Sequence, residues 1–164
     1  MVSDAAPAEL ELKPLSGDES HTLREWLTTF HLLTVVLDPF TAESAWLLPT
    51  VGRILRVYNE SDARVSITVT CDELGARQFL GPYAKEFLTF ADPDRNAVKA
   101  FGLSTLPAIV HVRQDLSIAG AAEGWDPDAW REVTEGLSLA LSWARPSIPA
   151  LRDPAPYPGT PALG

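Results

Sequence analysis

Apolar and polar positions between about residues 18 and 144 follow two periods that alternate along the chain. Short apolar or β-branched runs predict buried strands, and apolar residues three and four positions apart predict helices with one buried face. The strands are expected at 31–37, 64–71, 87–90, 108–113 and 117–122, and the helices at about 18–29, 42–58, 72–81, 92–101 and 126–141. Strands that alternate with helices indicate an α/β sheet, and the closing strand-turn-strand-helix adds an antiparallel edge.

Three prolines punctuate this pattern. Asp92-Pro93 and Asp126-Pro127 each have an N-cap residue followed by proline, which predicts that a helix begins there. Asp18 or Ser20 could cap the first helix in the same way, without a proline. Pro49 falls inside the predicted helix at 42–58, where it removes a backbone hydrogen bond and should bend the axis.

The two ends of the chain lack this periodicity. Residues 1–17 are acidic and interrupted by prolines, and we expect a loosely held arm in which Glu9–Leu12 could add an edge strand. Residues 145–164 contain six of the fourteen prolines and are expected to form an extended, mobile tail. The sequence thus predicts one domain, at 18–144, between two mobile ends.

Charge and composition narrow the class of function. The chain has 164 residues and a net charge of −9, which would repel phosphate backbones and anionic lipid, so we expect neither nucleic acid nor membrane as a partner. The first twenty residues hold five acids and one base, the reverse of a secretory signal, and the longest apolar run is far too short to span a bilayer. A cytoplasmic location is therefore expected.

Residues 97–112, AVKAFGLSTLPAIVHV, together with the order of elements and the proline-bent helix after the first strand, resemble the thioredoxin superfamily. The extra helix and strand at 72–90 are similar to the insertion of its TlpA and peroxiredoxin branch. The resemblance implies a three-layer sandwich around a central mixed sheet. It also implies a cis peptide bond between Leu106 and Pro107, beside a groove that binds extended peptides and that we call the cis-proline groove.

The same resemblance assigns the catalytic positions of the family to Thr41 and Ser44, counting back from Pro49. The family's chemistry needs a thiolate there, and a hydroxyl has neither the acidity nor the ability to form a disulfide. The resemblance therefore implies the fold of the family, but the residues at these two positions lack the thiols that its activity requires. We expect Thr41, Ser44, Leu106 and Pro107 to line a binding groove, with Trp46 exposed at its edge.

Other candidate chemistry is sparse. Cys71, the single cysteine, follows a strand and is expected to be a small buried hydrophobe, because the adjacent Asp72 also disfavours a thiolate. No histidine has the spacing of a metal ligand, His111 is expected to bond to backbone, and the sequence predicts neither a metal nor a cofactor. Asp92-x-Asp94 resembles the start of a calcium loop but lacks its glycine and its glutamate, and we interpret it as a helix cap.

Two hypotheses of function follow. The first is a redox-inactive thioredoxin-fold accessory protein, an assembly or chaperone-like module that binds a protein partner through the cis-proline groove, the proline-rich tail or both. Redox-inactive thioredoxin-like chaperones that assist the maturation of larger enzymes, hydrogenase accessory proteins among them, are one precedent. The second is an enzyme, a single-cysteine thiol oxidoreductase that uses Cys71.

Overall fold

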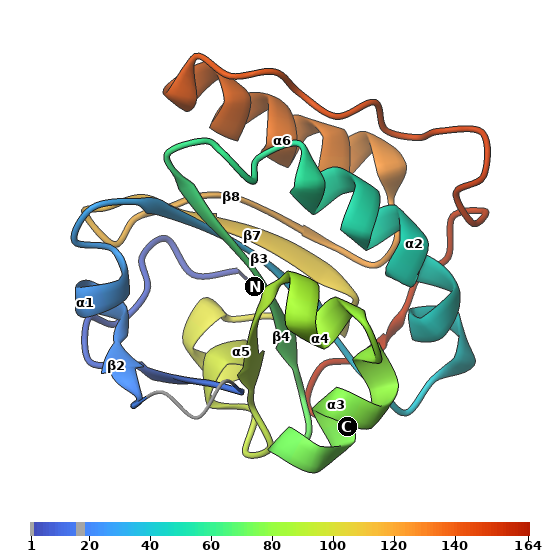
Figure 1. The fold of residues 1–164 in the computed structure, drawn as a ribbon, viewed down its shortest axis with the longest axis horizontal. Helices are drawn as coiled ribbons and strands as arrows, with labels where there is room; N and C mark the ends of the chain where they lie inside the picture. Colours follow the sequence, from blue (N-terminus) through green and yellow to red (C-terminus); the bar gives the residue numbers. More distant parts are fainter. Residues whose placement is uncertain (1, 16–18) are drawn as a thin grey trace.

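The computed structural model describes residues 2–15 and 19–164. In this part of the chain seven strands form one mixed sheet in the order β2-β1-β5-β4-β3-β7-β8 (Figure 1). Strands β3, β4 and β5 run parallel, and β7, β8, β1 and β2 pair antiparallel at the two sides. The strands are β1 (Glu11–Pro14), β2 (His21–Thr22), β3 (His31–Leu37), β4 (Ala63–Val69), β5 (Leu88–Ala91), β7 (Ala108–Val112) and β8 (Ile118–Glu123).

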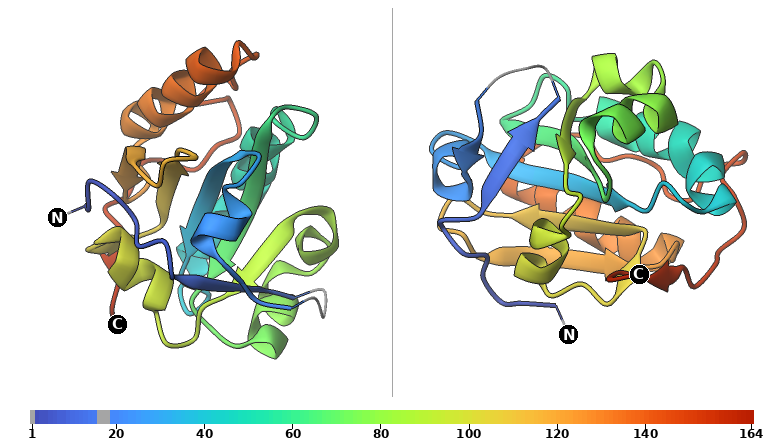
Figure 2. Two further views of the ribbon diagram at one scale, coloured as in Figure 1. Left: turned by 90° about the vertical axis from the view of Figure 1, so that its left-hand side faces the viewer. Right: turned by 90° about the horizontal axis from the view of Figure 1, so that it is seen from below.

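Helices cover both faces of this sheet (Figure 2). One face packs against α2, α3, α4 and α6, and the other packs against α1 and α5. The helices are α1 (Leu23–Trp26), α2 (Ala42–Arg56), α3 (Glu73–Leu80), α4 (Tyr83–Glu86), α5 (Asn96–Phe101) and α6 (Pro127–Leu141). The expected three-layer α/β sandwich with a helix-strand insertion is therefore confirmed.

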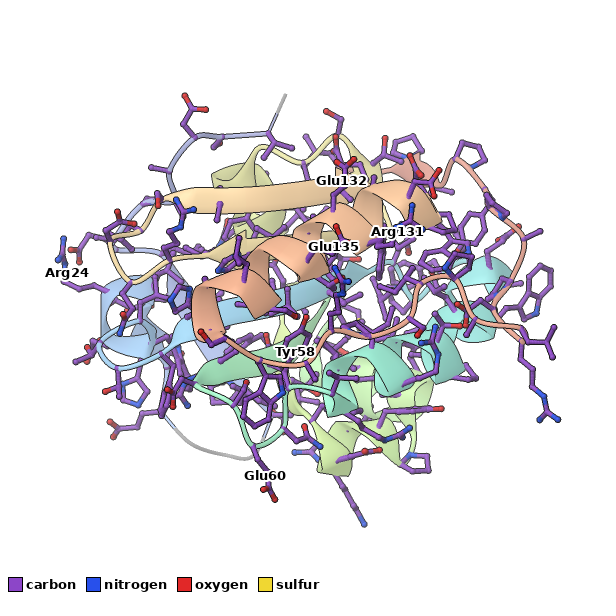
Figure 3. All side chains as sticks on the ribbon, turned by 90° about the horizontal axis from the view of Figure 1, so that it is seen from above. Arg24, Tyr58, Glu60, Arg131, Glu132 and Glu135 are labelled. Carbon is purple, nitrogen blue, oxygen red and sulfur yellow. The ribbon has the colours of Figure 1, made fainter. Side chains whose placement is uncertain are left out.

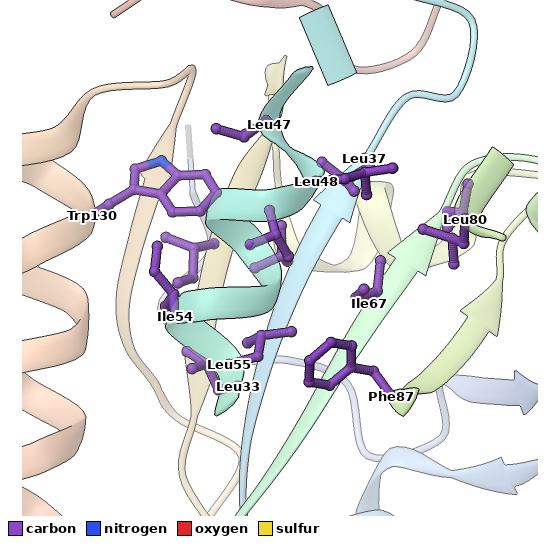
Figure 4. Close-up of a cluster of buried hydrophobic side chains, with 14 of the residues drawn as sticks. Leu33, Leu37, Leu47, Leu48, Ile54, Leu55, Ile67, Leu80, Phe87 and Trp130 are labelled. Carbon is purple, nitrogen blue, oxygen red and sulfur yellow. The ribbon is translucent and has the colours of Figure 1, made fainter. Parts of the chain in front are cut away.

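Strand β3 shows how the sequence builds the two cores. Leu33, Val35 and Leu37 pack under α2 and α6, whereas Leu32 and Val36 pack on the opposite face. Successive side chains of a strand point to opposite faces, so a continuous apolar run is what a strand covered on both sides requires. Figure 4 shows the first of these cores, in which Ile54, Leu55 and Trp130 are among the helix side chains that pack on the strands.

Two of the three prolines occupy the positions relative to the helices that the sequence predicts. Pro49 lies inside α2, and Pro127 is the first residue of α6, where the Asp126 carboxylate accepts from the Ala129 amide. The prediction for Asp92-Pro93 was wrong by three residues, because α5 begins only at Asn96 after Arg95 adopts a left-handed conformation. The Asp92 carboxylate still caps the helix from this distance.

The first helix is shorter than expected. It begins after Thr22, whose hydroxyl and backbone amide both pair with Glu25 in a capping box, so Ser20 is not the cap. Asp18 lies outside the described residues. Among the described residues, no helix is long and apolar enough to cross a bilayer.

The amino-terminal residues that the structure describes do not form a loose arm. Strand β1 pairs with both β5 and β2, which extends the sheet, and Leu12 and Leu15 are buried. The edge strand considered at Glu9–Leu12 forms two residues later than its alternation suggested. Neighbouring backbone groups of β5 supply the hydrogen bonds that offset the entropy of ordering this segment.

The C-terminal tail is also packed, contrary to the expectation of mobility. It runs back past α6 and α2, and its strand β9 (Thr160–Pro161) pairs antiparallel with β6 (Thr105–Leu106) (Figure 1). Ile148 and Ala162 are buried at its two ends. Proline denies the tail a long ladder of backbone bonds. The short pairing of β9 with β6 and single hydrogen bonds from Arg53 and Arg131 to tail carbonyls hold it in place.

Candidate functional site

Three segments meet at the end of the sheet where α2 begins. The cavity between them has a volume of about 180 Å³ and lies among the start of α2, the Leu106–Pro107 segment and the tail. The Leu106–Pro107 peptide bond is cis. The structure therefore brings Thr41 together with Leu106 and Pro107, as the cis-proline groove required. The lining is completed by Glu43, Tyr157, Pro158, Gly159 and Thr160.

Thr41 and Ser44 bond to each other at the start of α2. The distance between Thr41 Oγ1 and Ser44 Oγ is 2.8 Å, and Thr41 makes no side-chain cap bond to the helix. Ser44 is only 2% exposed and lies outside the lining of the cavity, although the sequence placed it there. The two hydroxyls thus share one hydrogen bond. Neither position carries a sulfur, and among the described residues no hydrogen bond joins either hydroxyl to a base that could activate it as a nucleophile.

Trp46 also lies outside the lining, one turn further along α2. Its side chain is 63% exposed, and Phe40, in the loop before the helix, is 74% exposed. Large apolar side chains are uncommon at such exposure, and grouped ones are typical of binding surfaces. Phe40 has a local cause as well, because the Asp38 carboxylate accepts from the Phe40 amide and fixes this turn.

Cys71 has the environment of an inert thiol. It is 8% exposed in the loop after β4. Burial, with smaller effects from the carboxylates of Asp72 and Asp38, raises the pKa of Cys71 to about 11. The thiolate is the nucleophilic form, so this environment suppresses thiol chemistry at neutral pH. The expectation of a buried cysteine is confirmed.

The histidine prediction requires a correction. His111 bonds to another side chain and not to backbone, because His31 Nδ1 and His111 Nε2 lie 2.9 Å apart. Antiparallel pairing of β3 with β7 brings these residues together across 80 positions, and no local pattern reveals it. Among the described residues no three histidine, cysteine, aspartate or glutamate side chains group as a metal site would require.

Comparison with solved structures places this geometry in a known fold. A thiol:disulfide interchange protein DsbE from Chlorobium tepidum is 15% identical, with a TM-score of 0.67 over 85% of this chain and 97% of that chain. A secreted disulfide oxidoreductase from Mycobacterium tuberculosis is 15% identical, with a TM-score of 0.61 over 80% and 96%. The bacterioferritin comigratory protein of Xanthomonas campestris, described for alkyl peroxide reduction, is 13% identical, with a TM-score of 0.64 over 88% and 99%.

These neighbours show the fold. The chain has the thioredoxin-like fold, in the arrangement shared by the DsbE or TlpA type and the peroxiredoxin type, which confirms the resemblance. No protein-family model matches the sequence, and no curated protein matches it.

The part of the site that the tail contributes was not predicted from the sequence. Tyr157, Gly159 and Thr160 line the cavity, although they lie about fifty residues beyond Pro107 in a segment expected to be mobile. The one local signal was Gly159 between two prolines, because a glycine in a stiff segment often marks a close backbone approach. Its φ of 88° falls in the left-handed region that favours glycine.

Proposed function

We propose that this chain uses the thioredoxin-like fold to bind a protein partner, as an assembly or chaperone-like accessory module without redox activity. The observation that carries the proposal is the pair of hydroxyls at the start of α2, Thr41 and Ser44, bonded to each other at 2.8 Å. They stand where the resemblance places the reactive cysteines. Loss of the sulfurs removes the chemistry but leaves the groove beside Pro107, and backbone pairing in such a groove does not depend on a thiol.

A second candidate function is a thiol oxidoreductase that uses Cys71. The similar structures favour it, since they include a thiol:disulfide interchange protein, a disulfide oxidoreductase and a protein of alkyl peroxide reduction. The environment of Cys71 speaks against it, because burial and two carboxylates raise the pKa of this thiol to about 11. In choosing between the two functions, we therefore give more weight to the residues of this chain than to the chemistry of its distant neighbours.

A redox assay separates the two candidates. The purified protein is expected to accelerate neither the reduction of insulin disulfides nor the reduction of peroxide when dithiothreitol or the thioredoxin system supplies the electrons. Cys71→Ser is the control, and it should leave both readings at the level of the wild-type protein. Turnover that disappears in Cys71→Ser would establish the oxidoreductase and reject the proposed function.

A binding assay tests the groove directly. Tagged wild-type protein, Thr41→Arg and Glu60→Arg would each be used to recover partners from the native host for mass spectrometry. Thr41→Arg adds a bulky charge to the groove, whereas Glu60 projects from the turn after α2 and is the matched control (Figure 3). We expect Thr41→Arg to lose interactors that Glu60→Arg keeps. Equal recovery of interactors by all three proteins would show that the partner binds to a surface other than the groove.

A further inference from the structure

The tail lies in the cis-proline groove as an added strand. Leu106 is paired antiparallel with Thr160, and Thr105 with Pro161. On either side of this pair, the Ala162 amide donates to Ser104 O at 2.9 Å and the Trp125 amide donates to Tyr157 O at 2.9 Å. Residues 157–162 therefore use the backbone groups that an incoming extended peptide would use.

Glycine makes this close approach possible at two points. A Cβ on Gly159 would overlap the carbonyl oxygen of Leu106, and a Cβ on Gly124 would lie 2.7 Å from the carbonyl oxygen of Pro158. Both glycines have positive φ angles, of 88° and 72°. The backbones of the tail and the groove are therefore complementary in shape. A chance contact between a surface loop and a tail would not require glycine at both points.

Polar contacts hold the segment from both sides of the groove. Tyr157 Oη donates to Glu43 O at 3.2 Å, and Thr160 Oγ1 donates to Asp38 Oδ2 at 3.4 Å. Arg95 Nη1 donates to Ala162 O at 2.5 Å, and Ala162 is 1% exposed. The segment is therefore bound at its start, middle and end.

A separate anchor keeps the tail close even when this segment leaves. The Asp153 carboxylate accepts from Thr50 Oγ1 at 2.8 Å, from Arg53 Nη2 at 2.7 Å and from the Ala150 amide at 2.7 Å. Ion pairing at Asp153 fixes residues just upstream of the groove segment. A short tether of this kind gives the segment a high local concentration, of the order of millimolar.

From these contacts we infer that residues 157–162 are a built-in occupant of the cis-proline groove, and that a partner gains the groove only by replacing them. This inference rests on the proposed function, in which the groove is the surface where a protein partner docks. It also describes the partner segment. That segment is extended, has a glycine opposite the Leu106 carbonyl, and is not acidic, because Asp38 and Glu43 border the site.

The test uses the full chain and its own tail as the probe. Gly159→Val places a Cβ against Leu106 O and should release the segment, and Ala162→Glu releases it independently by forcing a charge into a buried position. Ala155→Val, in an exposed part of the same tail, is the matched control. Fluorescence anisotropy would measure binding of a labelled peptide of residues 154–164, with a scrambled peptide as reference.

We expect the labelled peptide to bind Gly159→Val and Ala162→Glu at least about tenfold more tightly than it binds the wild-type protein or Ala155→Val. A ligand's apparent affinity falls by the fraction of protein in the competent state, and an open groove in under about a tenth of wild-type molecules gives this ratio. Hydrogen exchange of the backbone amides at positions 162 and 157, which donate to Ser104 O and Trp125 O in the wild-type protein, should accelerate in the same two variants.

Three outcomes would overturn the inference: amides that stay protected in both variants, a peptide that binds no better than its scrambled form, or equal affinity for all four proteins. These outcomes are distinct from failure of the proposed function. Peptide binding to the released variants would support the inference even if Thr41→Arg lost no interactor. Loss of interactors in Thr41→Arg would support the proposed function even if the tail did not compete for the groove.

Discussion

Protonation of the buried His111, which is paired with His31, should make folding depend on pH between about 4 and 6.5. His111 is 1% exposed, and its Nε2 lies 2.9 Å from Nδ1 of His31. Burial, followed by the neighbouring His31 and Arg113, lowers the pKa of His111 to about 4 from an ordinary 6.5. Burial and Arg113 also lower the pKa of His31, against an opposing effect of Asp115.

The sign and size of the effect follow from proton linkage. The unfolded chain protonates His111 near pH 6.5 and the folded chain only near pH 4, so the unfolded state binds more protons in this window and stability is lost as the pH falls. Each unit of pKa difference is about 1.4 kcal/mol, which gives about 2 kcal/mol lost by pH 5 and about 3 kcal/mol lost below pH 4. Asp92 acts in the opposite direction, because burial raises its pKa.

Urea denaturation at pH 7 and pH 5 would isolate the histidine contribution. His111→Gln keeps a hydrogen-bonding side chain that does not titrate, and the more exposed His21 provides the control His21→Gln. Between the two pH values, the free energy of unfolding of the wild-type protein and of His21→Gln should fall by about 2 kcal/mol more than that of His111→Gln. Asp92 is present in all three proteins and cancels. Equal pH dependence of the wild-type protein and His111→Gln would refute the reasoning.

Two further predictions concern single buried groups. Cys71 in the folded protein should react with iodoacetamide about 100-fold more slowly than in the urea-unfolded chain at the same pH, because the rise in its pKa from 9.0 to about 11 removes thiolate in that proportion. Equally fast reaction would favour the oxidoreductase. Tyr58→Phe should lower the free energy of unfolding by about 1–2 kcal/mol, since Tyr58 Oη bonds to Ser138 Oγ at 2.7 Å and to Thr134 O at 3.0 Å beneath α6 (Figure 3). Unchanged stability in urea would contradict this assignment.

Elements with a strong local signal were predictable from the sequence. Strand β3 occupies the expected residues 31–37, because a strand covered on both faces is rich in apolar residues on both sides, and five of its seven residues are leucine or valine. Helix α6 begins at Pro127 behind its Asp126 cap, as two adjacent residues specify. Short strands carry too few residues to show a clear period, so β1 was expected two residues too early and β6 and β9 were not predicted at all.

The candidate site likewise contains residues that could be predicted from the sequence and residues that could not. Thr41, Leu106 and Pro107 were placed through the resemblance to a known fold, and the structure brings them to one cavity. Gly159 and its neighbours were not, because their order depends on pairing with β6 across about fifty residues. A segment without periodicity is disordered only when nothing nearby offers partners for its backbone groups, and a groove beside a sheet end offers them.

The closed groove and the missing sulfurs argue for the same kind of function. A catalyst must admit substrate at every turnover, so a tethered competitor in its groove lowers the rate in proportion to the closed fraction. A binding module opens once for each partner it takes up, and there a competitor raises selectivity, because only a segment that matches the groove better than residues 157–162 displaces them. The pair of Thr41 and Ser44 fits this role, since both positions carry hydroxyls in place of the thiols that redox chemistry requires.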